Sequence, residues 1–144
     1  MADCVFCKTV SGEYDSSRIY EDDSLLAFMD INPVNSGHIL IIPKQHVELI
    51  ADLDDETSGK MFVLANKINK ALRASGIRLD GINYFLADGK AAGQEVFHTH
   101  LHVFPRYVND GFGLVFNENY RKNRPAKSVF DSIAEQVKSK LQLN

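Results

Sequence analysis

Long hydrophobic runs and clusters of basic residues are both missing from this chain of 144 residues. The longest run of aliphatic residues, Ile39 to Ile42, is far shorter than the ~20 apolar residues that cross a bilayer. Lysine and arginine form no stripe, and the net charge is −3. We therefore expect neither a membrane nor a nucleic-acid polymer as a partner. A small anionic ligand is compatible with this charge, because local hydrogen-bond donors can hold it.

Cysteine is scarce as well, since only Cys4 and Cys7 are present. The N-terminal segment has neither the basic start nor the apolar stretch of a secretory signal, so we expect a cytoplasmic protein. Thiols stay reduced in that compartment, where two cysteines suit metal or redox chemistry better than a structural disulfide. Repeats, low-complexity tracts and linkers are also lacking, and the length suits one domain over residues 1–144.

Hydrophobic periodicity indicates several short strands around one long helix. Apolar residues at three- and four-residue steps, after an acidic start and before Gly76, predict a helix over 54–75. A C-terminal helix is expected from about Pro125. Strands are predicted at 18–20, 25–29, 38–43, 82–86 and 96–104, the last stopped by Pro105, and a short helical turn at 4–10. Short connections between strands favour an α+β fold with a mainly antiparallel sheet.

Three of the five histidines occupy alternate positions of one segment: His98, His100 and His102. Side chains alternate between the two faces of a strand, so these three imidazoles are expected on one face. Histidine has no strong strand preference, and this grouping therefore favours chemistry over a merely polar surface. A metal held by two or three of them, as in zinc hydrolases, fits the same residues and stays open here.

The segment from His98 to Phe104 resembles the histidine-triad (HIT) motif, in which three alternate histidines precede two hydrophobic residues. The Asp30-Ile31-Asn32-Pro33 run, the run from Gly37 to Lys44, and the Gly93-Gln94 pair are also similar to that family. The likeness spans about residues 3–107, which leaves about 108–144 as a C-terminal extension. It implies a HIT-like α+β fold and a homodimer.

The resemblance also implies a mechanism. His100 would be the nucleophile, with a neutral ring nitrogen that attacks the α-phosphorus and forms a nucleotidyl-histidine, which water then hydrolyses. The other ring nitrogen would be held by the backbone carbonyl of His98. His102 would contact the phosphate and assist the leaving group, and His38 would support the triad. From the residues alone, His38 is equally well interpreted as a strand-end histidine bonded to backbone.

Nucleoside contacts follow from the same resemblance. Asp30 would accept hydrogen bonds from the ribose hydroxyls, a common use of a carboxylate. The base pocket would be lined by four apolar residues: Val5, Phe6, Phe28 and Ile31. Without the resemblance, a solvated turn aspartate and ordinary core packing explain the same positions.

Phosphate donors are expected in the glycine-containing loop before the triad. Gly93 permits close backbone approach, and the N–H groups of Gly93, Glu95 and Val96 would cradle the phosphate. Without the resemblance, an ordinary loop that needs glycine is the simpler interpretation. Glu95 stands where many relatives have Ser or Thr, and Ala87 where some have an amide. Since a carboxylate repels phosphate, we expect the Glu95 side chain to turn away. Both departures bear on the substrate class.

A structural zinc ion is the cofactor that the resemblance implies. The Cys-x-x-Cys pair alone is a weak motif, and spacing does not identify two further ligands. Some family members bind zinc through such a pair, a histidine after the second-strand proline and the first triad histidine. The corresponding residues are Cys4, Cys7, His46 and His98. Four protein ligands leave no open position, so we expect one structural zinc per chain.

Together these features predict a hydrolase that acts at the α-phosphate of a purine nucleotide conjugate. The conjugate would be a nucleoside phosphoramidate, an acyl-adenylate or a dinucleoside polyphosphate. Two alternatives remain at this point. One is a zinc-dependent hydrolase with metal on the triad, and the other is a non-enzymatic nucleotide-binding interaction protein.

Overall fold

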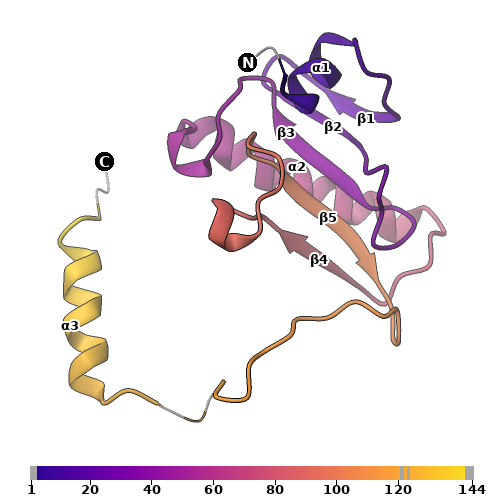
Figure 1. Cartoon of the computed structure of the whole chain (residues 1–144). Helices are drawn as coiled ribbons and strands as arrows, with labels where there is room; N and C mark the ends of the chain where they lie inside the picture. Colours follow the sequence, from indigo (N-terminus) through magenta and orange to yellow (C-terminus); the bar gives the residue numbers. More distant parts are fainter. Residues whose placement is uncertain (1–2, 121, 123, 142–144) are drawn as a thin grey trace. The chain divides into compact units, whose positions relative to one another are not determined.

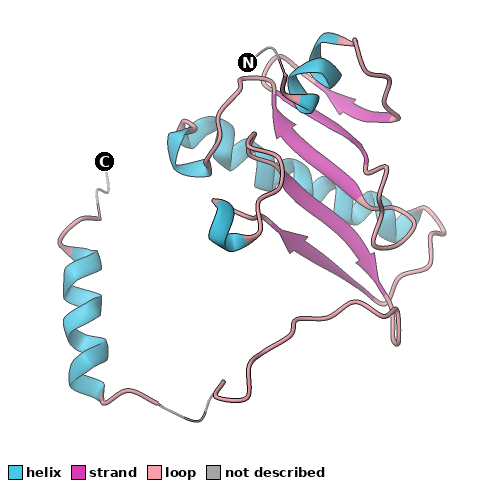
Figure 2. Cartoon of the chain, in the orientation of Figure 1, coloured by secondary structure: helices cyan, strands magenta, loops and turns pink. Residues whose placement is uncertain are grey.

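Five short strands form one antiparallel sheet in the computed structural model, which describes residues 3–120, 122 and 124–141 (Figures 1 and 2). The strands lie in the order β1-β2-β3-β5-β4, and each neighbouring pair is antiparallel. Their bounds are β1 Arg18–Glu21, β2 Leu25–Met29, β3 Ile39–Pro43, β4 Gly81–Phe85 and β5 Leu101–Arg106. The predicted mainly antiparallel sheet is therefore confirmed.

The helices also match the sequence pattern. They are α1 Val5–Ser11, α2 Asp55–Ala74 and α3 Lys127–Lys138, with 3-10 turns η1 Ile50–Asp52 and η2 Lys90–Ala92. α2 begins after Asp54, whose side chain accepts a hydrogen bond from the Thr57 backbone N–H at 2.8 Å. These helices and the sheet give the α+β architecture predicted for the chain. Among the described residues, none of the helices combines the length and apolar character needed to cross a membrane.

The sheet has two differently used faces. One face packs against α2 and forms the larger core, in which Leu101 and Val103 of β5 meet Ile39 and Ile41 of β3 (Figure 1). The opposite face carries α1 and a smaller cluster: Phe6, Leu26, Phe28, Leu40 and Ile42. Because side chains alternate along a strand, β5 sends Leu101 and Val103 into the larger core and His102 to the opposite face. The core thus fixes which way the triad points.

The predicted strand at 96–104 is wrong at both ends. Residues before Leu101 are extended, but they bond to loops instead of a neighbouring strand: the His98 N–H donates to Val96 and the Thr99 N–H to Val47. Pro105 does not stop the strand. The pairing between β3 and β5 ends at Val103, so beyond that point the missing proline N–H costs no bond to β3.

The chain divides into two compact units, Met1–Phe112 and Gly113–Asn144. The first contains the sheet, α1 and α2. The second contains α3, whose apolar side chains recur at three- and four-residue steps: Val129, Phe130, Ile133 and Val137. The helix predicted from about Pro125 is therefore present.

Gly37, which precedes the buried His38, provides a test of this packing. Its φ is +92°, and an added Cβ would lie 3.0 Å from Pro105 Cγ and 3.2 Å from Leu72 Cδ2. Gly76 has a similar φ of +80° but open space around the Cβ position. We expect Gly37→Ala to lower the free energy of unfolding by about 2–4 kcal/mol, because backbone strain and overpacking add. Gly76→Ala carries the strain alone, at about 1–2 kcal/mol. Equal losses in urea unfolding would contradict this account of Gly37.

Candidate active site

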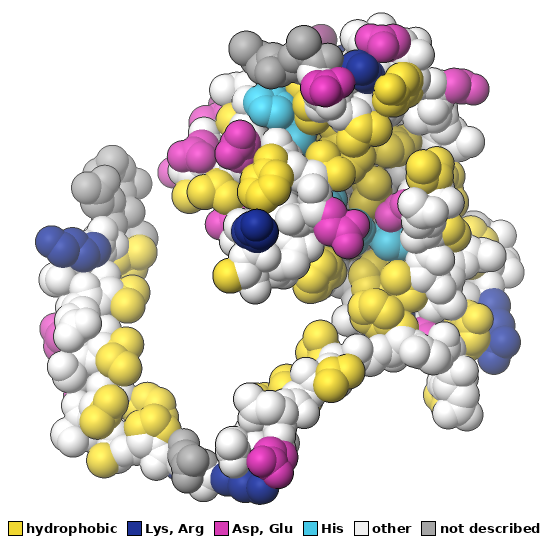
Figure 3. Space-filling view, in the orientation of Figure 1, with side chains coloured by type: hydrophobic (Ala, Val, Ile, Leu, Met, Phe, Trp, Pro, Cys, Tyr) yellow, Lys and Arg dark blue, Asp and Glu magenta, His cyan; other side chains and the backbone are white. Residues whose placement is uncertain are grey.

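A pocket of about 630 Å³ opens on the sheet face opposite α2. All the side chains assigned to catalysis and nucleotide binding from the sequence line this pocket: Val5, Phe6, Phe28, Asp30, Ile31, His38, Gly93, Glu95, Val96, His100 and His102. Figure 3 shows histidine in a hollow bordered by hydrophobic and acidic side chains. Residues from α1, four strands and the loop after η2 are thus brought together in one concave site.

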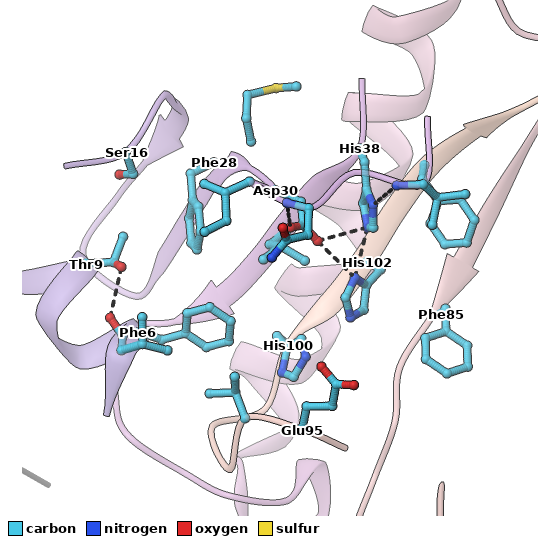
Figure 4. A pocket seen from close by; sticks show the side chains of 18 of the residues that line it. Phe6, Thr9, Ser16, Phe28, Asp30, His38, Phe85, Glu95, His100 and His102 are labelled. Atoms are coloured by element: carbon cyan, nitrogen blue, oxygen red, sulfur yellow. Dashed lines mark hydrogen bonds and ion pairs between the residues drawn. The ribbon is translucent and has the colours of Figure 1, made fainter. Parts of the chain in front are cut away.

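His100 sits at the centre of the pocket with one ring nitrogen engaged (Figure 4). Its Nδ1 lies 2.7 Å from the carbonyl oxygen of His98, which accepts a hydrogen bond only if Nδ1 carries the proton. Nε2 of the neutral ring then keeps its lone pair. Burial lowers the pKa of His100, which favours this neutral form. The hydrogen bond is the one expected from the sequence, and it leaves an imidazole nitrogen that is free to attack an electrophile.

His38 and His102 form a directed hydrogen-bonded pair. The Val34 backbone N–H donates to Nδ1 of His38 at 3.1 Å, so the His38 proton resides on Nε2. That Nε2–H points to Nδ1 of His102 at 2.9 Å (Figure 4). His102 in turn carries its proton on Nε2. His38 therefore both bonds to backbone and supports the triad, which unites the two interpretations of its sequence position.

Burial favours the uncharged form of both His38 and His102. Burial, followed by the nearby His100 and His38 rings, lowers the pKa of His102 to about 4. Burial lowers the pKa of His38 as well, although Asp30 opposes this shift. Asp30 Oδ2 lies 3.5 Å from His38 Nε2, and Asp30 Oδ1 accepts the Asn32 backbone N–H at 2.8 Å. The pocket thus presents neutral imidazoles of His38 and His102 at neutral pH.

The loop that was expected to cradle phosphate is braced by Gln94. This buried side chain donates to the carbonyls of Glu48 and Val96 and accepts the Gly89 N–H. Gln94 was visible in the sequence only as part of the family motif, and its bracing role was missed. Within the described part of the chain, the N–H groups of Glu95 and Val96 have no protein acceptor.

Two expectations for this loop are wrong. The Gly93 N–H donates to the Lys90 carbonyl at 3.0 Å, because the left-handed Gly93 closes the η2 turn, so it is not available to a phosphate. The Glu95 side chain does not turn away. It lines the pocket, and Figure 4 shows its carboxylate pointing toward His100. The expectation considered only repulsion from a phosphate, and local sequence could not show that the loop places this carboxylate beside His100.

The end of the pocket that the sequence analysis assigned to a nucleoside is aromatic. Phe6 and Phe28 are buried and meet edge to face at 5.9 Å, and Phe6 also contacts the His100 ring at 5.1 Å. Val5 is 39% exposed and Ile31 is 89% exposed, so these two are wall residues and not core. Sequence reasoning missed three further aromatic wall residues, Tyr14, Phe85 and Phe112, which carried no motif, and it used Phe104 only as a hydrophobic position of the triad motif.

A second cluster lies beside the pocket, where α1 meets the segment before β5. The ligand atoms of Cys4, Cys7, His46 and His98 lie within 4.8 Å of one another. Sulfur-to-Nδ1 distances are 3.3, 3.5 and 3.7 Å, and the two Nδ1 atoms are 3.3 Å apart. A tetrahedron with Zn–S near ~2.3 Å and Zn–N near ~2.05 Å requires about 3.5 Å and about 3.3 Å. The four side chains thus fit a zinc ion.

The Nε2 atom of His98 determines that Nδ1 can act as a metal ligand. This atom lies 2.8 Å from the carbonyl oxygen of Pro43, so Nε2 carries the proton and Nδ1 presents a lone pair to the cluster. This contact was not predicted, because a backbone carbonyl carries no signal in a sequence.

Asp30, His38 and His102 form another group of candidate ligands. A metal there would need the lone pair of His38 Nε2, and the ring proton would then move to Nδ1. The Val34 N–H already points at Nδ1 at 3.1 Å, so two donors would face each other. This hydrogen bond argues against a metal held by Asp30, His38 and His102.

Comparison with known proteins agrees with this geometry. A model of the HIT domain matches residues 11–109. The chain belongs to the HIT family. An uncharacterized HIT-like protein from Borreliella burgdorferi is 50% identical over 115 residues, which cover 79% of this chain and 83% of that protein. The crystal structure of a HIT family member from Bacillus subtilis has a TM-score of 0.85 at 36% identity and covers 99% of each chain.

Two further HIT relatives bear on the chemistry. A zinc-bound histidine triad family protein from Mycobacterium smegmatis has a TM-score of 0.73 at 42% identity and covers 84% of this chain and 87% of that chain. The adenylylsulfatase HINT3 from Arabidopsis thaliana is 40% identical over 109 residues, which cover 75% of this chain and 54% of that protein. The family thus includes zinc-bound and hydrolytic members.

The neutral His102 of this HIT protein predicts a pH dependence of stability. Unfolded histidine titrates near ~6.5, and burial lowers the pKa of His102 to about 4. Between these values the unfolded chain binds more protons, so stability falls as the pH decreases from 6.5 toward 4. The contribution of His102 is complete above the unfolded pKa and amounts to about 3 kcal/mol at 1.36 kcal/mol per unit.

Urea unfolding of the wild type and His102→Asn between pH 7 and pH 4.5 measures this contribution. We expect a shallower pH slope for the variant, since asparagine does not titrate. Parallel slopes would show that His102 is not held neutral.

Proposed function

We propose that this protein hydrolyses purine nucleotide conjugates at the α-phosphate through a nucleotidyl intermediate on His100. The hydrogen bond from His100 Nδ1 to the His98 carbonyl is the observation that carries the proposal, because it leaves Nε2 as the nucleophilic atom in the pocket. Phosphoramidates, acyl-adenylates and dinucleoside polyphosphates are the candidate substrates. A cytoplasmic location and a homodimer belong to the same proposal.

The bound nucleotide is placed by groups on both sides of His100. The ribose hydroxyls bond to Asp30, and the base packs on Val5, Phe6, Phe28 and Ile31. Phosphate oxygens accept the two unused N–H groups, those of Glu95 and Val96. This placement directs the α-phosphorus toward His100 Nε2.

The reaction then proceeds in two displacements. In the first, the bond from Nε2 to phosphorus forms while the bond from phosphorus to the leaving group breaks. In the second, water attacks phosphorus, a proton of that water passes to the His38–His102 pair, and His100 leaves as neutral imidazole. The N–H on Nδ1 stays hydrogen-bonded to the His98 carbonyl in both steps, which keeps the ring oriented.

The leaving group receives its proton from the His38–His102 pair. Burial keeps the pair neutral, but a nearby phosphate anion favours its protonated form. The protonated pair passes the Nε2 proton of His102 to the leaving atom and returns to the neutral state. The bond from His38 Nε2 to His102 Nδ1 holds the donor in place.

The zinc ion proposed for Cys4, Cys7, His46 and His98 has a structural role. When bound, it would supply a closed four-ligand site that joins α1, the segment after β3 and the segment before β5. His98 would then be fixed by ring and backbone together, and its carbonyl would stay aligned with His100. One zinc per chain is expected.

We predict that His100→Ala abolishes turnover of an adenosine phosphoramidate while the Kd for AMP changes by less than about tenfold. The substitution removes the attacking nitrogen and leaves the ribose and phosphate contacts in place. Single-turnover kinetics and calorimetric titration of AMP measure the two properties. Turnover at a rate near that of the wild type would rule out His100 as the nucleophile.

We predict that Cys7→Ser loses the metal. Stability should suffer more than turnover, seen as a lower melting temperature, because binding energy at a structural site is folding energy. Metal analysis should give one zinc per wild-type chain and less than about one tenth of that in the variant. Ser11→Ala, at the exposed end of the same helix, serves as the control and should keep the metal. A wild-type chain that binds no zinc, or a Cys7→Ser chain that retains it, would refute this site.

A further inference from the structure

The wall of the pocket carries acidic charge without basic compensation. Three carboxylates line it, those of Asp15, Asp30 and Glu95, and none of the lining residues is lysine or arginine. The His38 and His102 imidazoles do not compensate, since burial lowers their pKa values. Figure 3 shows acidic side chains beside the histidine in the hollow. A site for a polyanion normally offers cations, so this pocket is unusual for a polyphosphate.

Glu95 differs from the other two carboxylates because it has no partner in the described part of the protein. Asp15 accepts the Ser16 N–H, and Asp30 accepts the Asn32 N–H and lies near His38. The Glu95 side chain is exposed and forms neither a hydrogen bond nor an ion pair. Its carboxylate points toward His100, the proposed reaction centre (Figure 4).

The position of Glu95 is on the leaving-group side. In Figure 4, Phe6 and Phe28 lie to one side of His100, whereas the Glu95 carboxylate, His102 and Phe85 lie to its other side. The aromatic end takes the nucleoside under the proposed function. In an in-line displacement the leaving group departs on the side of phosphorus opposite the attacking nitrogen. A group that leaves beside His102 is then on the same side of His100 as the Glu95 carboxylate.

We propose that Glu95 selects the leaving group by charge, favouring an amine that bears N–H or ammonium donors and disfavouring a further phosphate chain. This inference rests on the proposed hydrolysis. Glu95 forms no covalent bond: it accepts a hydrogen bond from the departing amine, whose nitrogen loses its bond to phosphorus and gains the proton of His102. A terminal phosphate in the same place would meet an unpaired carboxylate.

Two phosphoramidates of nearly equal size and a polyphosphate test the idea on the full-length, zinc-loaded protein. The first carries adenosine 5′-phosphate on 1,3-diaminopropane, which ends in an ammonium group, and the second carries it on neutral butylamine. Diadenosine tetraphosphate is the polyanion. kcat/KM is measured for the wild type, for Glu95→Gln, and for Glu56→Gln, which removes one charge from the exposed start of α2.

We expect the wild type to prefer the ammonium over the butyl substrate by about fivefold, the upper range for an exposed ion pair. Glu95→Gln should bring that ratio close to one and raise the ratio of polyphosphate to butyl substrate by about fivefold. The wild-type preference should shrink as salt rises from 0.02 to 0.5 M, as screening requires, while Glu95→Gln shows no such trend. Glu56→Gln should keep the wild-type ratios.

The possible failures are distinguishable. If His100-dependent turnover occurs but Glu95→Gln keeps both wild-type ratios, the role of Glu95 is overturned and the proposed function stands. If Glu56→Gln changes the ratios as much as Glu95→Gln, overall charge and not Glu95 sets the preference, and the inference is also overturned. Hydrolysis that persists in His100→Ala, or no hydrolysis of any of the three conjugates by the wild type, overturns the proposed function and this inference together.

Discussion

Three bonds of His98 connect the two chemical centres of this protein. Its Nδ1 faces the Cys4, Cys7 and His46 ligand atoms, its Nε2 donates to the Pro43 carbonyl, and its own carbonyl accepts the Nδ1–H of His100. A shift of this residue would turn the His100 ring and weaken the metal cluster at once. His98 is fully buried, which makes each of these bonds costly to leave unmade. The orientation of the proposed nucleophile therefore depends on a residue that never faces the ligand.

The alternation of side chains along β5 explains how the fold places these histidines. β5 lies between β3 and β4, and its alternation sends Leu101 and Val103 into the core against α2. The histidine positions are then forced to the opposite face, where α1 and the loop after η2 close over them. Burial of neutral imidazoles is tolerated there because backbone groups satisfy one nitrogen of His38, of His98 and of His100. The same burial lowers the pKa values of these three histidines, so the packing that holds the rings also keeps them neutral.

Periodicity predicted most of the fold, because the elements are short, regular and strongly patterned. β2 and α2 lie within one residue of their predicted bounds, and the composition of the pocket followed from the HIT motif. The start of β5 was missed because local alternation cannot show that Thr99 bonds to Val47 across the chain. The Gly93 N–H and the Glu95 side chain were misjudged for the same reason. The Lys90 carbonyl that accepts the Gly93 N–H, and the position of Glu95 beside His100, arise only in the folded chain.

The central claim is that phosphorus is attacked by His100 and not directly by water. The stereochemical course at phosphorus tests it most directly, with an adenosine phosphorothioate conjugate that is chiral through oxygen isotopes. Two successive in-line displacements invert the configuration twice, so the account predicts net retention. A single displacement by a water molecule, as in direct or metal-assisted hydrolysis, inverts it once. Net inversion would contradict the account, whatever the variants at His100 show.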